Sequence, residues 1–455
     1  MTSDTPAADH HHPADESHLK ASIRKVALIA LAGTSIEWFD FFIYATAAAL
    51  VFPAAFFPES TPTVGLILSF GTFSFGFIAR PLGGILFGHF GDRVGRKRTL
   101  VIALVMMGTA STLIGLLPTY STIGVAAPIL LSLLRFTQGL AIGGQWGGAM
   151  LLVTESAPSD KRGYYGAYAQ AGAPFGVILA NLAFIIISAM VSEDFFMQWG
   201  WRIPFISSVI LIAISLYVQL HIEDTHAFKE LEALKAHKQA EGPTMETVER
   251  SPVLEALVKY PKRIALAAGS FLSIQVTFYI LIGFVLAYGG DPDGAAMSRG
   301  DMLFAVLIAS AAQIVAQFLA ASYSDRHGRR GAMMLGALLT GVWAFVLFPL
   351  IDTGNFWLFV LATSGGLVFL GVTYGPLAAF FTELFSTEVR YSGASLGYQI
   401  GAIVGGAFAP TIAMILWTEF DVFWVSVYIA IASALSLLSI MLLTETFKTN
   451  LNATD

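Results

Sequence analysis

The chain has 455 residues, of which 56% are hydrophobic and 12% charged, and it contains no Cys. Because soluble domains carry roughly 25% charged residues, this composition excludes a soluble globular protein and predicts an integral membrane protein. The absence of Cys excludes disulfides, thiolate catalysis and Cys-based metal sites. The formal net charge of −6 is less informative than the places where the charges fall.

Apolar segments follow one another along the chain, each long enough to cross a bilayer. A helix needs about 20 residues to cross a hydrocarbon layer of about 30 Å. The segments lie at 26–52, 64–88, 99–118, 126–154, 163–191 and 201–221, and then at 263–288, 301–323, 331–351, 355–382, 392–416 and 422–444. The sequence therefore predicts an all-α integral membrane protein with twelve transmembrane helices in two six-helix halves.

Basic residues outside these segments predict the orientation. All but four of the 25 Lys and Arg lie in the N-terminal tail (1–25), the linker (222–262) or the C-terminal tail (445–455), or in and beside the turns on the side of the membrane that holds these three segments. Because Lys and Arg are enriched in cytoplasmic loops, we expect both tails and the linker to be cytoplasmic. The halves, 26–221 and 263–444, then span the inner (plasma) membrane. The first tail lacks the layout of a cleaved signal, and we expect it to be disordered.

Two basic turns occupy matching places in the two halves. They read Gly-His-Phe-Gly-Asp-Arg-Val-Gly-Arg-Lys-Arg at 88–98 and Ser-Asp-Arg-His-Gly-Arg-Arg at 324–330. A second motif, Glu followed by Arg, also occurs once in each half, as Glu155 with Arg162 and Glu383 with Arg390. Both motifs repeat at a separation of about half the chain, which indicates an internal duplication. Duplicated halves are typical of secondary transporters.

Longer strings within the helices are more specific. They are Glu37-Trp-Phe-Asp-Phe-Phe-Ile-Tyr44, Ala79-Arg-Pro-Leu-Gly-Gly84, Arg135-Phe-Thr-Gln-Gly139, Gly143-Gly-Gln-Trp-Gly-Gly148 and Trp199-Gly-Trp-Arg-Ile-Pro-Phe205. With the basic turns, these strings resemble the major facilitator superfamily and, within it, the metabolite:proton symporter family, closest to the shikimate-transporter-like branch.

The resemblance covers the whole chain apart from its termini. It implies the major facilitator fold and alternating access. It also implies a proton-coupled secondary transporter that imports a small organic acid, either a shikimate-like hydroxy-carboxylate or a dicarboxylate. Members of the family usually carry Glu where this chain has Gln145, so a proton-coupling role is not carried over to that position.

Charged residues also lie inside the predicted helices, where a charge costs at least about 2.5–3.5 kcal/mol. They include Glu37, Asp40, Arg80 and Arg135. Counted at about 1.5 Å per residue, all of these come near the middle of the membrane, and we expect them to meet in one cavity of the N-terminal half. Such groups mark transport pathways by default. The alternative is a set of ion pairs that only hold the helices together.

The chemistry of these groups predicts their roles. The planar fork of an Arg fits a carboxylate in two parallel hydrogen bonds, so Arg135 is the preferred ligand for the substrate carboxylate and Arg80 the alternative. Burial disfavours a charged carboxylate and a nearby Arg favours it, so we expect Asp40 or Glu37 to bind the coupling proton. The same helical faces carry further candidates for substrate binding, which are Tyr44, Gln138 and Gln145.

The helices of the C-terminal half contain uncharged polar groups instead. These are Gln275, Tyr279, Gln313, Gln317, Tyr374, Tyr398 and Gln399. Amides and hydroxyls suit the hydroxyls or the ring of a small polyol acid, and we expect them to determine specificity. Hydrogen bonding between helices explains each of them singly just as well.

The duplicated motifs are candidates for gating. The resemblance implies that Asp92 and Arg93 belong to a cytoplasmic latch between the halves, which breaks as the cavity turns inward. The full set of gating candidates is Asp92, Arg93, Arg96, Glu155, Arg162, Asp325, Arg326, Glu383 and Arg390. The alternative is plain turn chemistry, in which Asp pairs with a helix N-terminus and Gly allows a tight turn.

Other classes of protein fit the sequence less well. A membrane-embedded enzyme would need a nucleophile, a metal or an acid–base cluster in the bilayer, but the His residues lie in tails, loops and helix ends. A receptor would need an output module, for which 222–262 is too short. We therefore expect no enzymatic activity, no catalytic or metal site, no cofactor besides the coupling proton, no nucleic-acid partner, and a monomer in the lipid bilayer. A zwitterion symporter for betaine-like or proline-like cargo, and a facilitator or exchanger without proton coupling, remain alternatives.

Overall fold

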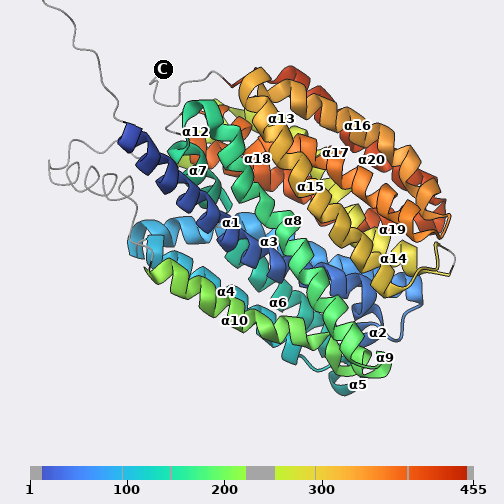
Figure 1. Ribbon diagram of the computed structural model, residues 1–455. Helices are drawn as coiled ribbons and strands as arrows, with labels where there is room; N and C mark the ends of the chain where they lie inside the picture. The colour runs from blue at the N-terminus through green and yellow to red at the C-terminus, as the bar shows by residue number, and fades with distance from the viewer. Residues whose placement is uncertain are drawn as a thin grey trace, which may run out of the picture.

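The computed structural model describes residues 13–94, 96–143, 146–221, 252–292, 294–386 and 389–447; within these ranges the undescribed side chains include those of 13–22, 88–94, 96–100 and 146–149. Every regular element in the described ranges is a helix. The long helices lie side by side, with those of the N-terminal half on one side of the bundle and those of the C-terminal half on the other (Figure 1). α1 begins and α20 ends at the same end of this bundle (Figure 1).

The N-terminal half is built from long apolar helices. They are α1 (Pro13–Leu50), α3 (Pro62–Val94), α4 (Arg96–Leu116), α6 (Ala126–Gly143), α8 (Arg162–Met190) and α10 (Arg202–His221). Short elements join them, namely α2 (Phe52–Phe56), α5 (Tyr120–Ile123), α7 (Trp146–Ser156), η1 (Ser159–Lys161), α9 (Glu193–Phe195) and η2 (Phe196–Gly200). A helix satisfies its own backbone hydrogen bonds, which is why apolar segments in lipid take this form.

The C-terminal half repeats the arrangement with two interrupted spans. Its long helices are α15 (Arg299–His327), α16 (Arg329–Ile351), α17 (Phe356–Glu383) and α20 (Val422–Leu442). One interrupted span joins α13 (Pro261–Tyr279), the π-helical turn η3 (Ile280–Phe284) and α14 (Val285–Gly290), and the other joins α18 (Arg390–Ala402), the π-helical turn η4 (Ile403–Ala407) and α19 (Ala409–Glu419). A short helix, α12 (Pro252–Lys259), precedes the half.

The predicted spans all correspond to helices. Ten helices among the described residues are long and apolar enough to cross a membrane. The sixth predicted span is the bent pair Glu193–Gly200 and Arg202–Ile214, whose parts meet at 48°, and the third is the shorter apolar helix Val101–Leu116. The prediction of an all-α fold with twelve transmembrane segments is therefore confirmed.

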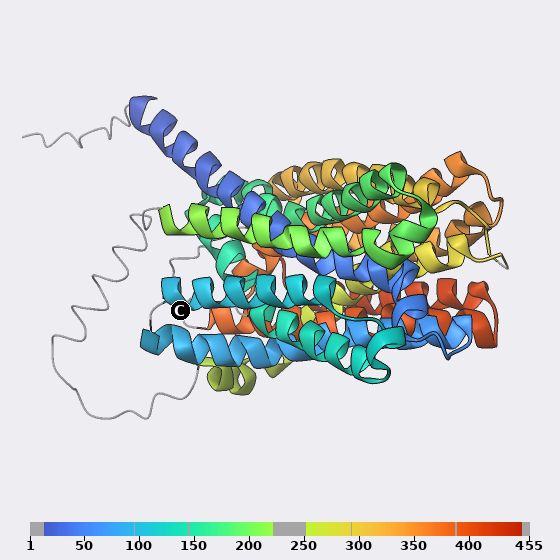
Figure 2. The same ribbon diagram turned by 90° about the horizontal axis from the view of Figure 1, so that it is seen from below.

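The structure differs from the prediction at the start of the first helix. We expected a disordered tail up to residue 25, but α1 already begins at Pro13 and its first turns project beyond the rest of the bundle (Figure 2). The reason is that no Pro or Gly interrupts the segment after Pro13, and Pro is favoured in the first turn of a helix. Residues 1–12, 222–251 and 448–455 of the predicted tails and linker lie outside the described residues.

α3 and α6 lie backbone to backbone, which positions the charged residues that they carry. A Cβ atom added to Gly139 would lie 2.1 Å from the carbonyl oxygen of Gly76, and one added to Gly143 would lie 1.9 Å from that of Arg80. Only glycine permits such an approach. As a result, Arg80 of α3 and Arg135 of α6 are brought into one layer of the N-terminal half.

Candidate functional site

Two arginines lie at the centre of the N-terminal half, enclosed by aromatic rings. Arg80 is 1% exposed and Arg135 is fully buried. Both guanidinium groups pack against the ring of Phe41, with their central carbons 4.5 Å (Arg80) and 3.9 Å (Arg135) from its centroid. Tyr44 and Phe73 also surround Arg135, at 4.2 and 4.6 Å. The π faces stabilise the two cations without using their N–H donors.

Several of these N–H donors have no partner among the described residues. In both arginines the Nε and Nη2 atoms are buried and make no hydrogen bond there. Gly76 lies opposite Arg135, where a Cβ atom would come within 2.7 Å of Nε. Buried donors are nearly always paired in folded proteins, so these atoms are the most conspicuous feature of the site. Each arginine presents a fork that suits an anion.

The carboxylate of Asp40 belongs to a hydrogen-bonded chain that leads to Arg135. Ser111 of α4 donates to Oδ2 of Asp40 at 2.7 Å, and Gln138 donates through Nε2 to the Ser111 hydroxyl at 2.6 Å. Arg135 in turn donates through Nη1 to Oε1 of Gln138 at 3.0 Å. Ser208 of α10 also lies beside the carboxylate, whereas Oδ1 has no hydrogen-bond partner among the described residues.

Glu37 is placed differently from Asp40. It lies one turn earlier on α1 and is only partly buried. Among the described residues, no ion pair or hydrogen bond to its carboxylate occurs. The structure thus brings Asp40, Arg80 and Arg135 together and leaves Glu37 at the margin of the group.

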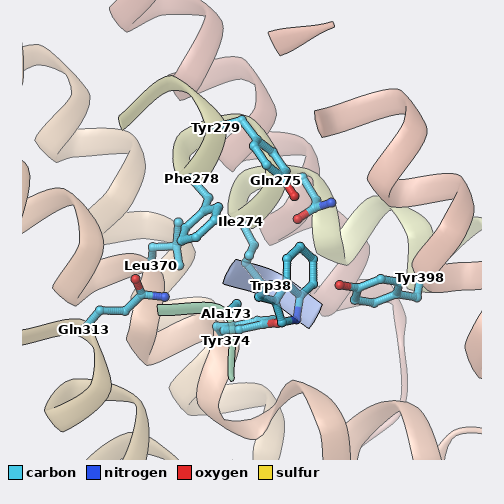
Figure 3. A pocket seen from close by; sticks show the side chains of 10 residues that line it. All are labelled: Trp38, Ala173, Ile274, Gln275, Phe278, Tyr279, Gln313, Leu370, Tyr374 and Tyr398. Carbon is cyan, nitrogen blue, oxygen red and sulfur yellow. The ribbon is translucent and has the colours of Figure 1, made fainter. Parts of the chain in front are cut away.

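A narrow cavity lies between the two halves, next to Arg80. It has room for about one water molecule and is lined by Trp38 and Ala173 from the N-terminal half. The C-terminal half contributes most of the lining, including Gln275, Tyr279, Gln313, Tyr374 and Tyr398, which Figure 3 shows around the Trp38 indole. A space of this size is far smaller than a ligand pocket, which usually measures about 300–1,000 Å³, so the cavity is closed in this conformation.

The polar groups of the C-terminal half divide into paired and unpaired ones. Both amide atoms of Gln313 and the Nε2 of Gln275 are buried without a partner among the described residues. Gln317, in contrast, donates to the carbonyl oxygen of Ala167 in the other half at 3.0 Å. Hydrogen bonding between helices therefore accounts for Gln317, but it does not account for the two amides that line the cavity.

The N-terminal candidates divide in a similar way. Tyr44 donates to the Thr72 hydroxyl at 2.6 Å and packs under Arg135. Gln138 is 1% exposed and lies between Arg135 and Ser111, away from the cavity lining. Gln145 lies outside the described residues. Trp38 and Ser111 were not identified from the sequence, although Trp38 stands between Glu37 and Asp40 in the first specific string.

At the end of the bundle that holds both described termini, a buried charge network joins the halves. Asp325 accepts hydrogen bonds from the backbone N–H groups of Gly163 and Tyr164, both at 2.8 Å, at the start of α8 in the other half. Arg329 pairs with Asp325 at 2.5 Å and with Glu383 at 3.1 Å. We refer to Asp325, Arg329 and Glu383, with the start of α8, as the inner network, after the cytoplasmic side on which the distribution of Lys and Arg predicts this end.

Further contacts cross the interface nearby. Arg390 pairs with Glu155 of the other half at 3.2 Å, and the hydroxyl oxygens of Thr154 and Thr382 lie 3.1 Å apart. Arg162 begins α8 and lies beside Glu383. The structure thus brings together Glu155, Arg162, Asp325, Glu383 and Arg390 of the gating candidates.

Arg326 does not join this network. It is exposed, and no hydrogen bond or ion pair involving it occurs among the described residues. Arg329 takes part instead because Gly328, with a φ of 101°, ends α15 and turns the chain so that Arg329 faces Asp325. The side chains of Asp92, Arg93 and Arg96 lie outside the described ones, so their predicted latch stays a prediction.

A membrane-spanning bundle of two six-helix halves, with buried charges in one half and a cavity between them, defines a secondary transporter of the major facilitator class. The chain belongs to the family described as "Sugar (and other) transporter", which it matches over residues 25–453. It is thus a multi-pass membrane transporter of small metabolites and not an enzyme.

Individual relatives agree with this assignment. The chain is 41% identical to the inner membrane metabolite transport protein YhjE of Escherichia coli, over 93% of this chain and 95% of that one. It is 38% identical to the shikimate transporter of Escherichia coli, over 95% and 97% of the two chains. The proton:xylose symporter XylE of E. coli has the same fold, with a TM-score of 0.71 at 17% identity over 94% of this chain and 98% of XylE.

Proposed function

We propose that the protein imports a small organic acid together with a proton by alternating access. The observation that carries the proposal is the pair of buried arginines whose Nε and Nη2 donors lack partners among the described residues. A carboxylate is the substrate group that best satisfies such donors, because it accepts two parallel hydrogen bonds from one guanidinium. The similarity to a shikimate transporter supports a hydroxy-carboxylate over a dicarboxylate.

Arg80 is the better candidate for the direct carboxylate ligand. Its guanidinium carbon lies 5.5 Å from the ring centroid of Trp38 and interacts with Tyr279, and both of these residues line the cavity. The sequence alone favoured Arg135, but that side chain is tied to Gln138 and packs against rings that do not line the cavity. We therefore assign the substrate carboxylate to Arg80 and regard Arg135 as the partner of the proton site.

The other two elements of the proposal are the coupling site and the specificity site. Asp40 is the proposed proton carrier, because it is buried, lies in the same layer as the arginines, and has one oxygen without a partner among the described residues. The unpaired amides of Gln275 and Gln313 are proposed to bind the hydroxyl groups of the substrate. A substrate bound at this place contacts both halves, as alternating access requires.

The proposed orientation in the membrane follows from the distribution of Lys and Arg along the sequence. Both termini and the inner network then face the cytoplasm, and the protein acts as a monomer in the inner membrane. Glu37 remains a second candidate for proton binding, since its partly buried carboxylate lies one turn from Asp40.

Uptake into proteoliposomes tests the proposal. Labelled shikimate, with quinate, α-ketoglutarate, citrate and betaine as competitors, is supplied with and without an inward proton gradient. We expect accumulation only with the gradient and competition by hydroxy-carboxylates. Arg80→Lys keeps the charge but loses the fork, so it should weaken apparent affinity by about 10- to 100-fold, while Arg326→Lys serves as an exposed control. Accumulation of betaine but not of acids would refute the anion site.

A further inference from the structure

The chain of hydrogen bonds between Arg135 and Asp40 has a fixed direction. Arg135 can only donate, so the oxygen of the Gln138 amide must face it and the NH₂ group must face Ser111. The Ser111 hydroxyl accepts a hydrogen bond from Gln138 and donates one to Oδ2 of Asp40. Every link is 3.0 Å or shorter, and all four side chains are at most 1% exposed.

This direction makes the chain sensitive to the charge of Asp40. Hydrogen bonds to an ionised group are roughly twice as strong as neutral ones, and neighbouring bonds in a chain strengthen one another. Ionised Asp40 therefore holds Ser111, Gln138 and Arg135 in the observed arrangement. A proton on the unpaired Oδ1 turns Oδ2 into a neutral acceptor and weakens every link, which loosens Arg135 where it packs beside Arg80, the proposed carboxylate ligand, on the ring of Phe41.

Among the described residues, this chain is the only hydrogen-bonded route from Asp40 to Arg135, and the two charges also interact through space. No described ion pair joins Asp40 to Arg135 directly. Ser208 of α10 is the other polar group beside the carboxylate. The charged or titratable side chains of this layer on α1, α3, α6 and the facing helix of the C-terminal half are Glu37, Tyr44, Arg80, Arg135 and Tyr279.

We propose that Ser111 and Gln138 are positioning residues that transmit the protonation state of Asp40 to Arg135, and through Arg135 to the neighbouring Arg80, and thereby couple proton binding to anion binding. The inference rests on the proposed proton-coupled transport and assigns two residues to the coupling step. Gln138 acts within the protein in this scheme and does not contact the substrate. Ser111 is the link on α4, and without it Asp40 and Arg135 interact only through space.

The test separates binding from coupling in proteoliposomes that contain the full chain. Ser111→Ala removes the donor to Asp40, and Ser111→Thr keeps it. Gln138→Met breaks the chain of hydrogen bonds at a second place. Ser310→Ala is the matched control, because Ser310 is equally buried but donates only to the carbonyl oxygen of Val306 in its own helix. Shikimate binding at acidic and alkaline pH, gradient-driven accumulation and exchange between internal and external shikimate are measured for each variant.

We expect Ser111→Ala and Gln138→Met to keep exchange while their accumulation falls by about tenfold, the usual effect of disconnecting a buried hydrogen bond. The difference in affinity between the two pH values should shrink in both, and Ser111→Thr and Ser310→Ala should retain it. A wild-type pH profile and accumulation ratio in Ser111→Ala or Gln138→Met overturns the inference and leaves the proposed function intact. A uniform loss of binding at both pH values also overturns it, since it indicates a purely structural role. Wild-type uptake that ignores the gradient overturns the proposed coupling and this inference together.

Discussion

The two ends of the interface between the halves are closed by different kinds of contact. At the inner end, Asp325, Arg329 and Glu383 form a buried network with the start of α8, and their side chains are at most 4% exposed. At the opposite, outer end, Arg299 of α15 binds Glu193 of α9 through two hydrogen bonds of 3.0 and 2.6 Å. These side chains are 20% and 66% exposed.

The difference in burial determines how each end opens. An exposed ion pair contributes about 0–1 kcal/mol and is screened by salt. Removing one partner from a buried pair costs about 3–5 kcal/mol, because the other charge is left without compensation. The inner network must therefore open as a unit when Asp325 leaves the N-terminus of α8, whereas the outer pair separates readily into water. In the proposed alternating-access cycle, we therefore expect the balance between inward- and outward-facing states to be decided mainly at the inner end.

Locking the inner end gives the largest expected effect. Thr154→Cys combined with Thr382→Cys places two thiols where hydroxyl oxygens lie 3.1 Å apart across the halves, and the chain has no other Cys. Oxidation should form a disulfide and reduce uptake of labelled shikimate to background, and a reductant should restore it. Each single variant under the same oxidant is the control. Normal uptake by the cross-linked protein would mean that the inner end does not open during transport.

Weakening the inner network gives the next largest effect. Asp325→Asn removes the charge that holds Arg329 and the two N–H groups of α8. A hydrogen bond to a charged group is worth about 1.5–3 kcal/mol, so the inner end should open at least about tenfold more often. The measurement is maleimide labelling of a buried Thr382→Cys reporter in inside-out vesicles. Arg326→Gln, a neighbouring change outside the network, should leave the rate unchanged, and an equal rate in Asp325→Asn would contradict the prediction.

The sequence predicted the spans and the buried charges because each depends on a local rule. About 20 apolar residues are needed to cross a bilayer, and a charge within such a segment requires a reason. Ser111 escaped prediction because a Ser in a membrane helix commonly bonds a carbonyl of its own helix. Only the packing of α1, α4 and α6 shows that this hydroxyl meets Asp40 and Gln138.

The inner network shows a second limit. The sequence placed Asp325, Glu383, Arg390 and Glu155 in matching motifs, but it did not distinguish Arg329 from Arg326. That choice depends on where α15 ends, since the left-handed backbone at Gly328 redirects the chain. In the same way, the sequence ranked Arg135 above Arg80 as the carboxylate ligand without the position of the cavity, which depends on how the two halves meet.

Removing the outer ion pair gives the smallest expected effect and completes the comparison. Arg299→Gln should change shikimate uptake by no more than about threefold, because the pair is exposed and contributes about 0–1 kcal/mol. Glu193→Gln should have a similar effect, and the double variant should be no worse than Arg299→Gln, because all three lack the same ion pair. High salt should reduce the difference from wild type. Arg299→Gln also removes the contact of Arg299 with the Phe196 ring, at 4.3 Å. We therefore expect it to reduce uptake slightly more than Glu193→Gln does. A tenfold effect of either variant would put the outer closure on a par with the inner network, and the conformational balance would then be set at both ends.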